Sequence, residues 1–363
     1  MRVFYIFVKQ NQLEYGLVSG QLIEKYSESR LMNFLRKLLF PFSLLYSLVT
    51  AIRNWLFDKG WFKSYSFEVP VIVVGNLSVG GTGKTPQIEY LVRLLAPHYK
   101  VATLSRGYKR KSEGFVLASS TSNAEELGDE PFQMAQKFPE LIVAVDANRK
   151  NGIEQLLNLP VAPQVILLDD AFQHRKVKAK MYILLTTYSE LYCEDYVLPT
   201  GNLRESSRGA QRANVIIVTK CPRDLSQAEQ QRIQKKIGIN RPVFFSYIDY
   251  DAVVYSKEDT KEVSAIHSLP KLLVAGIAKP APFFSYLDSG SDDRLEYPDH
   301  HFFTDNDIKT IQQKAKDGLI ITTEKDYVRL KDQGLKSLYY LPIKSSFING
   351  KDDFDRIVMS GCD

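Results

Sequence analysis

The sequence predicts an α/β fold of the P-loop NTPase kind, and three observations lead to this prediction. The apolar stretch 69–74 is followed by a glycine-rich loop and then by a helical pattern at 88–95. Apolar stretches alternate with helical patterns in both halves of the chain, which is typical of parallel sheets. The chain has 363 residues, of which 44% are hydrophobic and 25% charged, and this fits about two globular domains.

The charge and the cysteines exclude several classes of protein. The net charge of +5 is a mild basic excess without the dense basic stripe of nucleic-acid binders, so we expect no nucleic-acid partner. Cys193, Cys221 and Cys362 lack metal-ligand spacing, and an odd, scattered set of cysteines suits a reducing compartment. No pattern in the sequence indicates an obligate protein partner.

Residues 1–31 differ from the rest of the chain and lack the apolar core of a secretory signal. We treat them as an extra N-terminal segment, and we hypothesise that translation can begin at Met32. The apolar residues that follow recur at gaps of four and three, which predicts one apolar face of a helix. These residues are Leu31, Leu35, Leu38, Phe42, Leu45, Val49, Ile52 and Leu56.

The predicted helix, 32–62, has the features of a helix that lies in a membrane interface. Its uncharged run, 38–52, is shorter than the roughly 20 residues that span a bilayer. Basic residues flank this run, and Trp55, Trp61 and Phe62 follow it, as is typical of interfacial helices. An amphipathic helix packed on the protein core by its apolar face is the alternative, and a transmembrane span is a third.

The loop 75–86, G-N-L-S-V-G-G-T-G-K-T-P, has the strand-loop-helix context of a P-loop. Backbone N–H groups of such a loop bind phosphate, Lys84 would reach the β- and γ-phosphates, and the Thr85 hydroxyl would bind Mg²⁺. The strict pattern starts with glycine, where this chain has Ser78. A glycine-rich turn with an incidental lysine is the alternative. The predicted nucleotide-binding residues are Ser78, Val79, Gly80, Gly81, Thr82, Gly83, Lys84 and Thr85.

Two further strands carry information about the nucleotide and the metal. The apolar stretch 165–170 ends in Asp169 and Asp170, as does the strand that supports Mg²⁺ in P-loop enzymes. Adjacent strand residues point to opposite faces, so one carboxylate is expected at the metal and the other in a bracing or capping role. The strand at 215–222 ends in T-K-C-P and lacks the guanine-reading aspartate of GTPases, which favours ATP.

Polar residues gather at the predicted carboxyl ends of strands, where open α/β sheets bind ligands. They are Arg106, Arg149, Gln173, His174, Arg204 and Glu205. Asp129 and Glu130 open a helical stretch, and spacing alone favours Asp129 as an N-cap. For His174, the sequence supports a structural role and a functional role equally well. The pair His300 and His301 reads, from spacing alone, as surface histidines in a loop.

The second half alternates in the same way, with strands at 271–276 and 319–323 and a helix at 306–316. The aromatic, β-rich stretch 243–255 marks the predicted domain boundary. We therefore expect a P-loop catalytic domain over 63–245 and a smaller α/β domain over 246–363 that closes over the cleft.

Taken together, eight short segments resemble the tetraacyldisaccharide 4'-kinase family of lipid A biosynthesis, in order from about Met32 to the C-terminus. They are 75–86, 105–108, 128–131, 146–149, 169–175, 201–205, 299–300 and 322–326. The resemblance implies two α/β/α sandwich domains joined by a short β linker, with a peripheral, monotopic N-terminal helix on the cytoplasmic face of the inner membrane. It implies transfer of the γ-phosphate of ATP to the 4'-hydroxyl of lipid A disaccharide 1-phosphate, which yields lipid IVA.

The resemblance also assigns roles to residues. It implies that Lys84 acts on phosphate and that Asp129 and His300 form a dyad that activates the sugar hydroxyl; His301 borders this motif. It implies Mg²⁺ ligands among Thr85, Asp169, Asp170 and Glu205. Further active-site positions are Arg106, Glu130, Arg149, Gln173, His174 and Arg204. A P-loop NTPase that acts as a switch or delivers a metal, and a membrane scaffold with a degenerate nucleotide site, are the alternatives.

Overall fold

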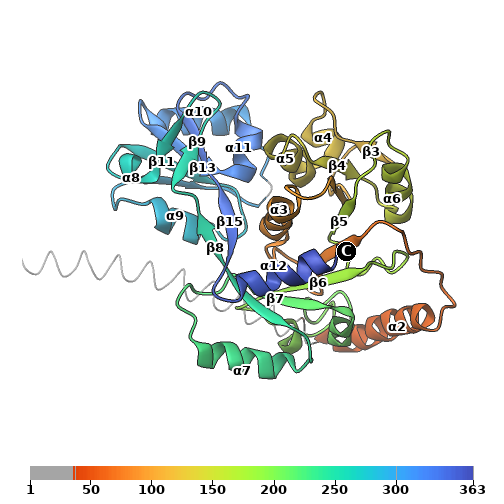
Figure 1. Cartoon of the computed structure of the whole chain (residues 1–363). Helices are drawn as coiled ribbons and strands as arrows, with labels where there is room; N and C mark the ends of the chain where they lie inside the picture. Colours follow the sequence, from red (N-terminus) through yellow and green to blue (C-terminus); the bar gives the residue numbers. More distant parts are fainter. Residues whose placement is uncertain (1–35, 37, 300, 363) are drawn as a thin grey trace, which may run out of the picture.

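The computed structural model describes residue 36, residues 38–299 and residues 301–362. The predicted segment 1–31, the start of the predicted membrane helix and the predicted base His300 lie outside the described residues. Two sheets with their helices form a larger and a smaller unit (Figure 1). This arrangement confirms the predicted α/β fold class.

The larger unit is built on a nine-stranded sheet with the order β15-β8-β7-β6-β1-β5-β2-β4-β3. Its strands are β1 (Val71–Asn76), β2 (Val101–Ser105), β3 (Val116–Leu117), β4 (Ile142–Val145), β5 (Val165–Asp169), β6 (Met181–Thr187), β7 (Val215–Thr219), β8 (Val243–Tyr250) and β15 (Ile343–Phe347). The neighbours from β8 to β4 pair in parallel, whereas β15 and β3 pair antiparallel at the two edges. The carboxyl ends of the parallel strands therefore meet at one edge of the sheet.

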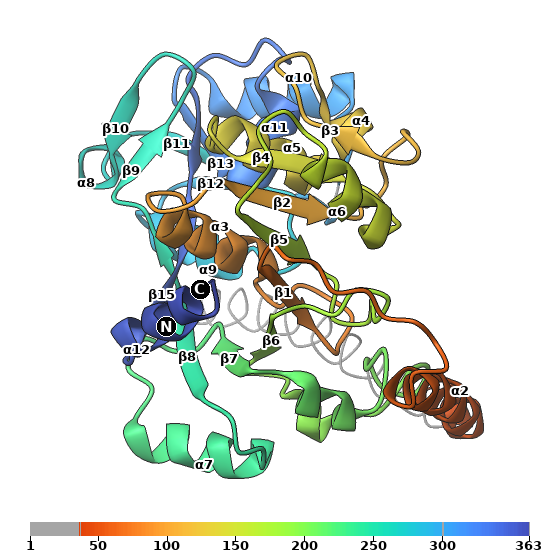
Figure 2. The ribbon, with the colours of Figure 1, turned by 45° about the vertical axis from the view of Figure 1, so that its right-hand side comes forward.

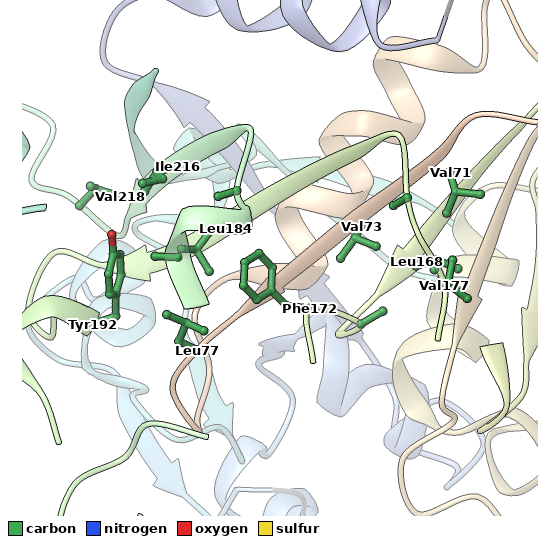
Figure 3. Close-up of a cluster of buried hydrophobic side chains, with 14 of the residues drawn as sticks. Val71, Val73, Leu77, Leu168, Phe172, Val177, Leu184, Tyr192, Ile216 and Val218 are labelled. Carbon is green, nitrogen blue, oxygen red and sulfur yellow. The ribbon is translucent and has the colours of Figure 1, made fainter. Parts of the chain in front are cut away.

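Strand β1 shows why the stretch 69–74 is apolar at nearly every position. The side chains of Val71 and Val73 pack in one core cluster, and those of Ile72 and Val74 pack in another on the opposite face. A parallel sheet covered on both faces has this continuous apolar pattern. Figure 3 shows the first cluster, in which the Phe172 ring lies beside β1.

Helices cover both faces of the larger sheet. The cluster around Ile72 includes side chains from α3 (Lys84–Leu95), α5 (Asp129–Lys137) and α12 (Lys351–Ser360). The cluster around Val73 includes side chains from α6 (Arg149–Leu157), α7 (Gln227–Ile237) and the 3-10 helices η1 (Tyr192–Glu194) and η2 (Ser207–Arg212). The short helix α4 (Ala124–Leu127) precedes α5. The phosphate loop is thus anchored between a buried strand and a buried helix.

The smaller unit has a six-stranded sheet with the order β10-β9-β14-β13-β11-β12. Its strands are β9 (Val253–Tyr255), β10 (Thr260–Glu262), β11 (Lys271–Ala275), β12 (Asp293–Glu296), β13 (Leu319–Thr323) and β14 (Leu338–Leu341). Helices α8 (Val263–Ile266) and α9 (Ala281–Leu287) contribute to one core cluster. Helices α10 (Asp305–Ala315) and α11 (Glu324–Leu330) contribute to the other.

Strands β8 and β15 connect the two units and pair antiparallel, with Ile343 opposite Tyr250. The structure differs here from the predicted division into 63–245 and 246–363, because β15 joins the larger sheet and α12 packs on it. Phe354 of α12 is fully buried, and its ring lies 5.4 Å from that of Phe244 and 4.7 Å from that of Phe347. The residues from 343 onward therefore belong to the larger unit.

Helix α2 (Phe40–Asp58) lies at the end of the molecule opposite α10 (Figures 1 and 2). The described residues of its predicted apolar stripe are largely exposed: the exposed fraction is 60% for Leu45 and 58% for Val49. Ser43 and Thr50 are buried instead. The alternative in which the apolar face of this helix packs on the protein core is therefore wrong.

Polar contacts attach α2 to the larger unit. Ser43 Oγ donates to Thr200 Oγ1 at 2.7 Å, and Asn54 Nδ2 donates to Glu205 Oε2 at 2.6 Å. Arg175 Nη1 donates to the Asn54 carbonyl oxygen at 2.8 Å. Within the part of the chain that the structure describes, no helix combines the length and the apolar character needed to cross a membrane.

Candidate active site

The glycine-rich loop connects β1 to α3 at the carboxyl edge of the larger sheet. Gly83 precedes α3 with a φ of 82°, a left-handed conformation that favours glycine. Gly75 packs so closely on Phe172 that a Cβ at this position would lie 2.8 Å from the Phe172 Cβ. Because the loop leads directly into a helix N-terminus, its N–H groups suit the binding of phosphate.

Two residues at the end of β7 hold this loop in place. Thr219 Oγ1 donates to the Thr82 carbonyl oxygen at 2.8 Å, and Lys220 Nζ donates to that of Gly81 at 2.6 Å. In the sequence, Thr219 and Lys220 stand out only because no guanine-reading aspartate follows them. Their position at the carboxyl end of a parallel strand, on the edge of the sheet where the loop also lies, was the signal for this second role.

Asp170 links the loop to the turn at 199–205. Lys84 Nζ lies 3.7 Å from Asp170 Oδ1, and Arg204 Nη1 donates to both carboxylate oxygens at 2.8 and 2.9 Å. Asp170 has a φ of 48°, a left-handed conformation that aspartate tolerates better than most residues. Of the two adjacent aspartates, Asp170 is therefore the one in contact with Lys84.

Asp169 points into the protein instead. Its Oδ1 atom is buried and has no hydrogen-bond partner among the described residues. Burial, together with the charge of Glu130, raises the pKa of Asp169 to about 7, although Lys84 acts in the opposite direction. A cavity of about 20 Å³, large enough for one water-sized group, is lined by Thr85, Ser105, Glu130 and Asp169 among others.

The predicted residues Arg149, Arg106 and Gln173 surround the same strand ends. Arg149 is buried and its Nη2 donates to the Asp169 carbonyl oxygen at 3.1 Å. Burial lowers the pKa of Arg149 to about 10, and the positive charge of Arg106 contributes to this shift. Gln173 Nε2 donates to the Asn76 carbonyl oxygen at 2.8 Å, which joins the loop after β5 to the end of β1.

His174 lines a cleft of about 930 Å³ beside the C-terminal end of α2. Burial lowers the pKa of His174 to about 4, so its imidazole is neutral at neutral pH.

The same cleft is lined by cationic and aromatic side chains. The Nζ atoms of Lys63 and Lys150 lie 5.0 and 4.8 Å from the centre of the Tyr65 ring. Five cationic side chains line the cleft: Arg53, Lys63, Lys150, Arg175 and Lys176. Phe57, Trp61, Phe62 and Tyr65 add aromatic surface to it.

Asp129 is the first residue of α5 and does not cap it. Gly128 occupies the N-cap position with a φ of 89°, and no side chain caps the helix there. The reading of Asp129 as an N-cap, which spacing alone favoured, is therefore wrong. Its carboxylate forms an ion pair with Arg329 of α11, in the smaller unit. The predicted partner His300 lies outside the described residues.

His301 has a well-defined structural setting. Its Nε2 atom lies 3.0 Å from Asp307 Oδ2, and its ring stacks on Tyr297 with the centres 4.8 Å apart. Asp307 in turn forms the capping box of α10 with Thr304. These contacts tie His301 to the core of the smaller unit.

Glu205 lies apart from the cavity at Asp169. It is fully buried, and Arg212 donates to its two oxygens at 2.7 and 3.1 Å. Asn54 of α2 donates to the same carboxylate. In residues 38–299 and 301–362, no three histidine, cysteine or acidic side chains form a metal-binding group. A carboxylate at this site would therefore need further oxygen ligands to hold a metal, from the Thr85 hydroxyl or from a bound nucleotide.

Comparisons with known proteins agree with this geometry. The pattern of the family described as tetraacyldisaccharide-1-P 4'-kinase matches residues 35–362. The chain is 64% identical over 327 residues to a tetraacyldisaccharide 4'-kinase from Flavobacterium johnsoniae, which covers 89% of this chain and 96% of the relative. It is 45% identical over 345 residues to the enzyme of that name from Bacteroides thetaiotaomicron, which covers 88% and 91%.

Among solved structures, the fold matches the crystal structure of LpxK from Aquifex aeolicus in complex with ATP. The TM-score is 0.76 at 30% sequence identity, and the match covers 91% of this chain and all of that chain.

Proposed function

The chain belongs to the tetraacyldisaccharide-1-P 4'-kinase family, and from this premise we propose which of its residues carry out the reaction. It is a kinase that transfers the γ-phosphate of ATP to the 4'-hydroxyl of tetraacyldisaccharide 1-phosphate in lipid A biosynthesis. The alternatives of a switch, a metal-delivery NTPase or a scaffold do not account for this family membership.

The phosphate loop binds ATP. The observation that carries this assignment is the convergence of Lys84, Asp170 and Arg204 beside the helix N-terminus at Gly83. Phosphoryl transfer depends on positioning and on neutralising negative charge, which the N–H groups of the loop and the lysine ammonium provide. The related structure is a complex with ATP, which supports nucleotide binding by this fold.

Thr85 and Asp169 fit a role in holding Mg²⁺. The buried Oδ1 of Asp169 has no described partner and lines the small cavity together with Thr85 and Glu130, and Mg²⁺ prefers hard oxygen ligands of this kind. When bound with the nucleotide, Mg²⁺ would neutralise charge on the phosphate oxygens. Asp170 is held by Lys84 and Arg204 and would brace the loop. Glu205, already paired with Arg212, does not fit the ligand set.

Asp129 and His300 would activate the 4'-hydroxyl, which is a weak nucleophile that a base within hydrogen-bond reach assists. Asp129 belongs to the larger unit, and the segment 299–303 belongs to the smaller one. The dyad would therefore assemble where the two units face each other. Assembly of the base from two units would restrict phosphoryl transfer to the closed, water-poor site.

The large cleft beside α2 would receive the phosphorylated disaccharide. Its cationic rim suits an anionic head group, and its aromatic walls suit a sugar ring. The exposed apolar stripe of α2 lies next to this cleft and would insert into the cytoplasmic face of the inner membrane as a peripheral, monotopic anchor. A lipid substrate could then reach the site without leaving the bilayer.

The test is transfer of labelled γ-phosphate from ATP to lipid A disaccharide 1-phosphate in detergent micelles. We expect labelled lipid with the native chain and a loss of about 10²–10³-fold with Lys84→Ala, because one phosphate-binding cation is removed. Lys235→Ala on α7, an exposed lysine of the same size far along the sheet, is the matched control and should retain native activity. Equal label with Lys84→Ala and the native chain would refute the assignment of the loop.

A further inference from the structure

Arg329 of α11 contacts Asp129 of the proposed base and the backbone of His301, the residue that follows His300 in the sequence. Its guanidinium forms an ion pair with Asp129 Oδ2 of the larger unit. Its Nη1 atom donates to the His301 carbonyl oxygen at 3.0 Å, in the segment that also carries His300. The same guanidinium lies 5.7 Å from the centre of the Phe302 ring. The Arg329 side chain is only 11% exposed, so these contacts are largely shielded from water.

The guanidinium is suited to this double contact. It is planar, always charged, and presents its donors in a fixed fork. When one nitrogen of the fork is bound to a carboxylate and another to a backbone oxygen, the relative position of these two acceptors is fixed. Here the two acceptors, the Asp129 carboxylate and the His301 carbonyl oxygen, belong to different units. Arg329 therefore sets their register.

The units do not depend on Arg329 alone to stay together at this interface. Helices α5 and α11 lie side by side in both views (Figures 1 and 2). Lys137 of α5 pairs with Glu324 of α11 at 2.7 Å, and Lys331 Nζ donates to Gln136 Oε1 at 2.8 Å. Loss of the Arg329 fork should therefore spare the docking of the units while releasing Asp129.

We propose that Arg329 is a positioning residue for the kinase reaction: it aligns the Asp129 carboxylate with the backbone at His301 when the two units meet. The proposal rests on the proposed function of Asp129 and His300. In this role Arg329 would act through Asp129 and would not itself touch ATP or the hydroxyl group. Its effect is expected on the rate of transfer at saturating substrates, and not on the binding of ATP.

The experiment compares Arg329→Met and Arg329→Lys with the matched control Lys331→Met, which removes a cation from the same interface without touching Asp129. Arg329→Met should lower kcat about 10- to 100-fold, because a small misplacement of a catalytic group has effects of this size. The KM for ATP should stay within about twofold and the melting temperature near the native value. Arg329→Lys should recover part of kcat, and Lys331→Met should keep it.

A double variant tests whether Arg329 affects kcat through Asp129. In an Asp129→Asn background, Arg329→Met should cause less than about a threefold further loss of kcat, since residues that act as a unit are not additive. Full additivity, a native kcat for Arg329→Met, or a loss that follows a lowered melting temperature would overturn the proposal. If Asp129→Asn itself has native kcat, the proposed dyad fails as well. An inactive Asp129→Asn beside a native Arg329→Met refutes the positioning role alone.

Discussion

Replacement of Glu205 by alanine separates a structural role from a metal-binding role. The resemblance to the kinase family placed Glu205 among the Mg²⁺ ligands, whereas the structure buries its carboxylate completely between Arg212 and Asn54. A ligand of the metal should affect the Mg²⁺ dependence of the reaction. A buried ion-pair partner should affect the free energy of unfolding. The variant Glu205→Ala distinguishes the two.

The expected loss of stability follows from the contacts. Removing one partner of a buried ion pair costs about 3–5 kcal/mol because the remaining charge is uncompensated. Arg212 is 20% exposed, and its guanidinium lies 4.8 Å from the centre of the Phe172 ring, so part of its charge stays solvated or stacked. The lower limit of about 3 kcal/mol therefore applies. Loss of the hydrogen bond from Asn54 adds about 1 kcal/mol.

Thermal unfolding measures this loss. At about 2–4 °C per kcal/mol for a chain of this class, the total loss of about 4 kcal/mol should lower the melting temperature of Glu205→Ala by about 8–16 °C relative to the native protein. The control is Glu125→Ala, which breaks an exposed ion pair with Lys111 and should shift the free energy of unfolding by less than about 1 kcal/mol. The Mg²⁺ concentration that gives half-maximal kinase activity should be unchanged. Native melting together with a weakened Mg²⁺ dependence would refute the structural role.

Four further predictions address the core, the site, the membrane contact and the cleft. Phe354→Ala should lower the free energy of unfolding by about 3–5 kcal/mol in urea titrations, because the ring is fully buried in α12; a loss below about 1 kcal/mol would contradict its place in the core. The raised pKa of Asp169, about 7, means that the folded state favours the protonated carboxyl. The protonated carboxyl therefore stabilises the folded state fully below about pH 4, and this contribution disappears as the pH rises through 7. In metal-free urea titrations, the free energy of unfolding of the native protein should be lower at pH 8 than at pH 5, and Asp169→Asn should remove this difference. Leu45→Glu should reduce flotation with anionic vesicles without a change in melting, because that side chain is exposed. Lys63→Glu combined with Lys150→Glu should raise the KM for the lipid but not for ATP; an unchanged KM for the lipid would exclude the cleft as the head-group site.

The central part of the fold was predictable because its signals are local. The continuous apolar run of β1 follows from burial on both faces, and the loop up to Lys84 follows from the need to turn from a strand into a helix. The return of residues 343–362 to the larger sheet was not predictable from local signals. Strand β15 pairs with β8, almost a hundred residues earlier, and no local property of its five residues specifies that partner.

The orientation of α2 shows a second limit. The spacing of its apolar residues predicts an apolar face, but it does not predict whether that face packs on the protein core or is exposed to solvent or a membrane. The answer depends on polar partners that are remote in sequence, such as Thr200 and Glu205, which receive hydrogen bonds from the opposite face. Once these contacts hold the helix by its polar side, the apolar side has to face outward.

The role of Asp129 depends in the same way on tertiary structure. The sequence places it where an N-cap would stand, and a local reading has no reason to prefer another role. In the structure Gly128 takes the cap position, which its φ of 89° favours, and the Asp129 side chain pairs with Arg329, 200 residues further along the chain. If Asp129 capped α5, its carboxylate would be held by backbone N–H groups of that helix. Because the Asp129 carboxylate is held by the other unit, the proposed base would be complete only while the two units are together, and water would have less access to the bound ATP in that state.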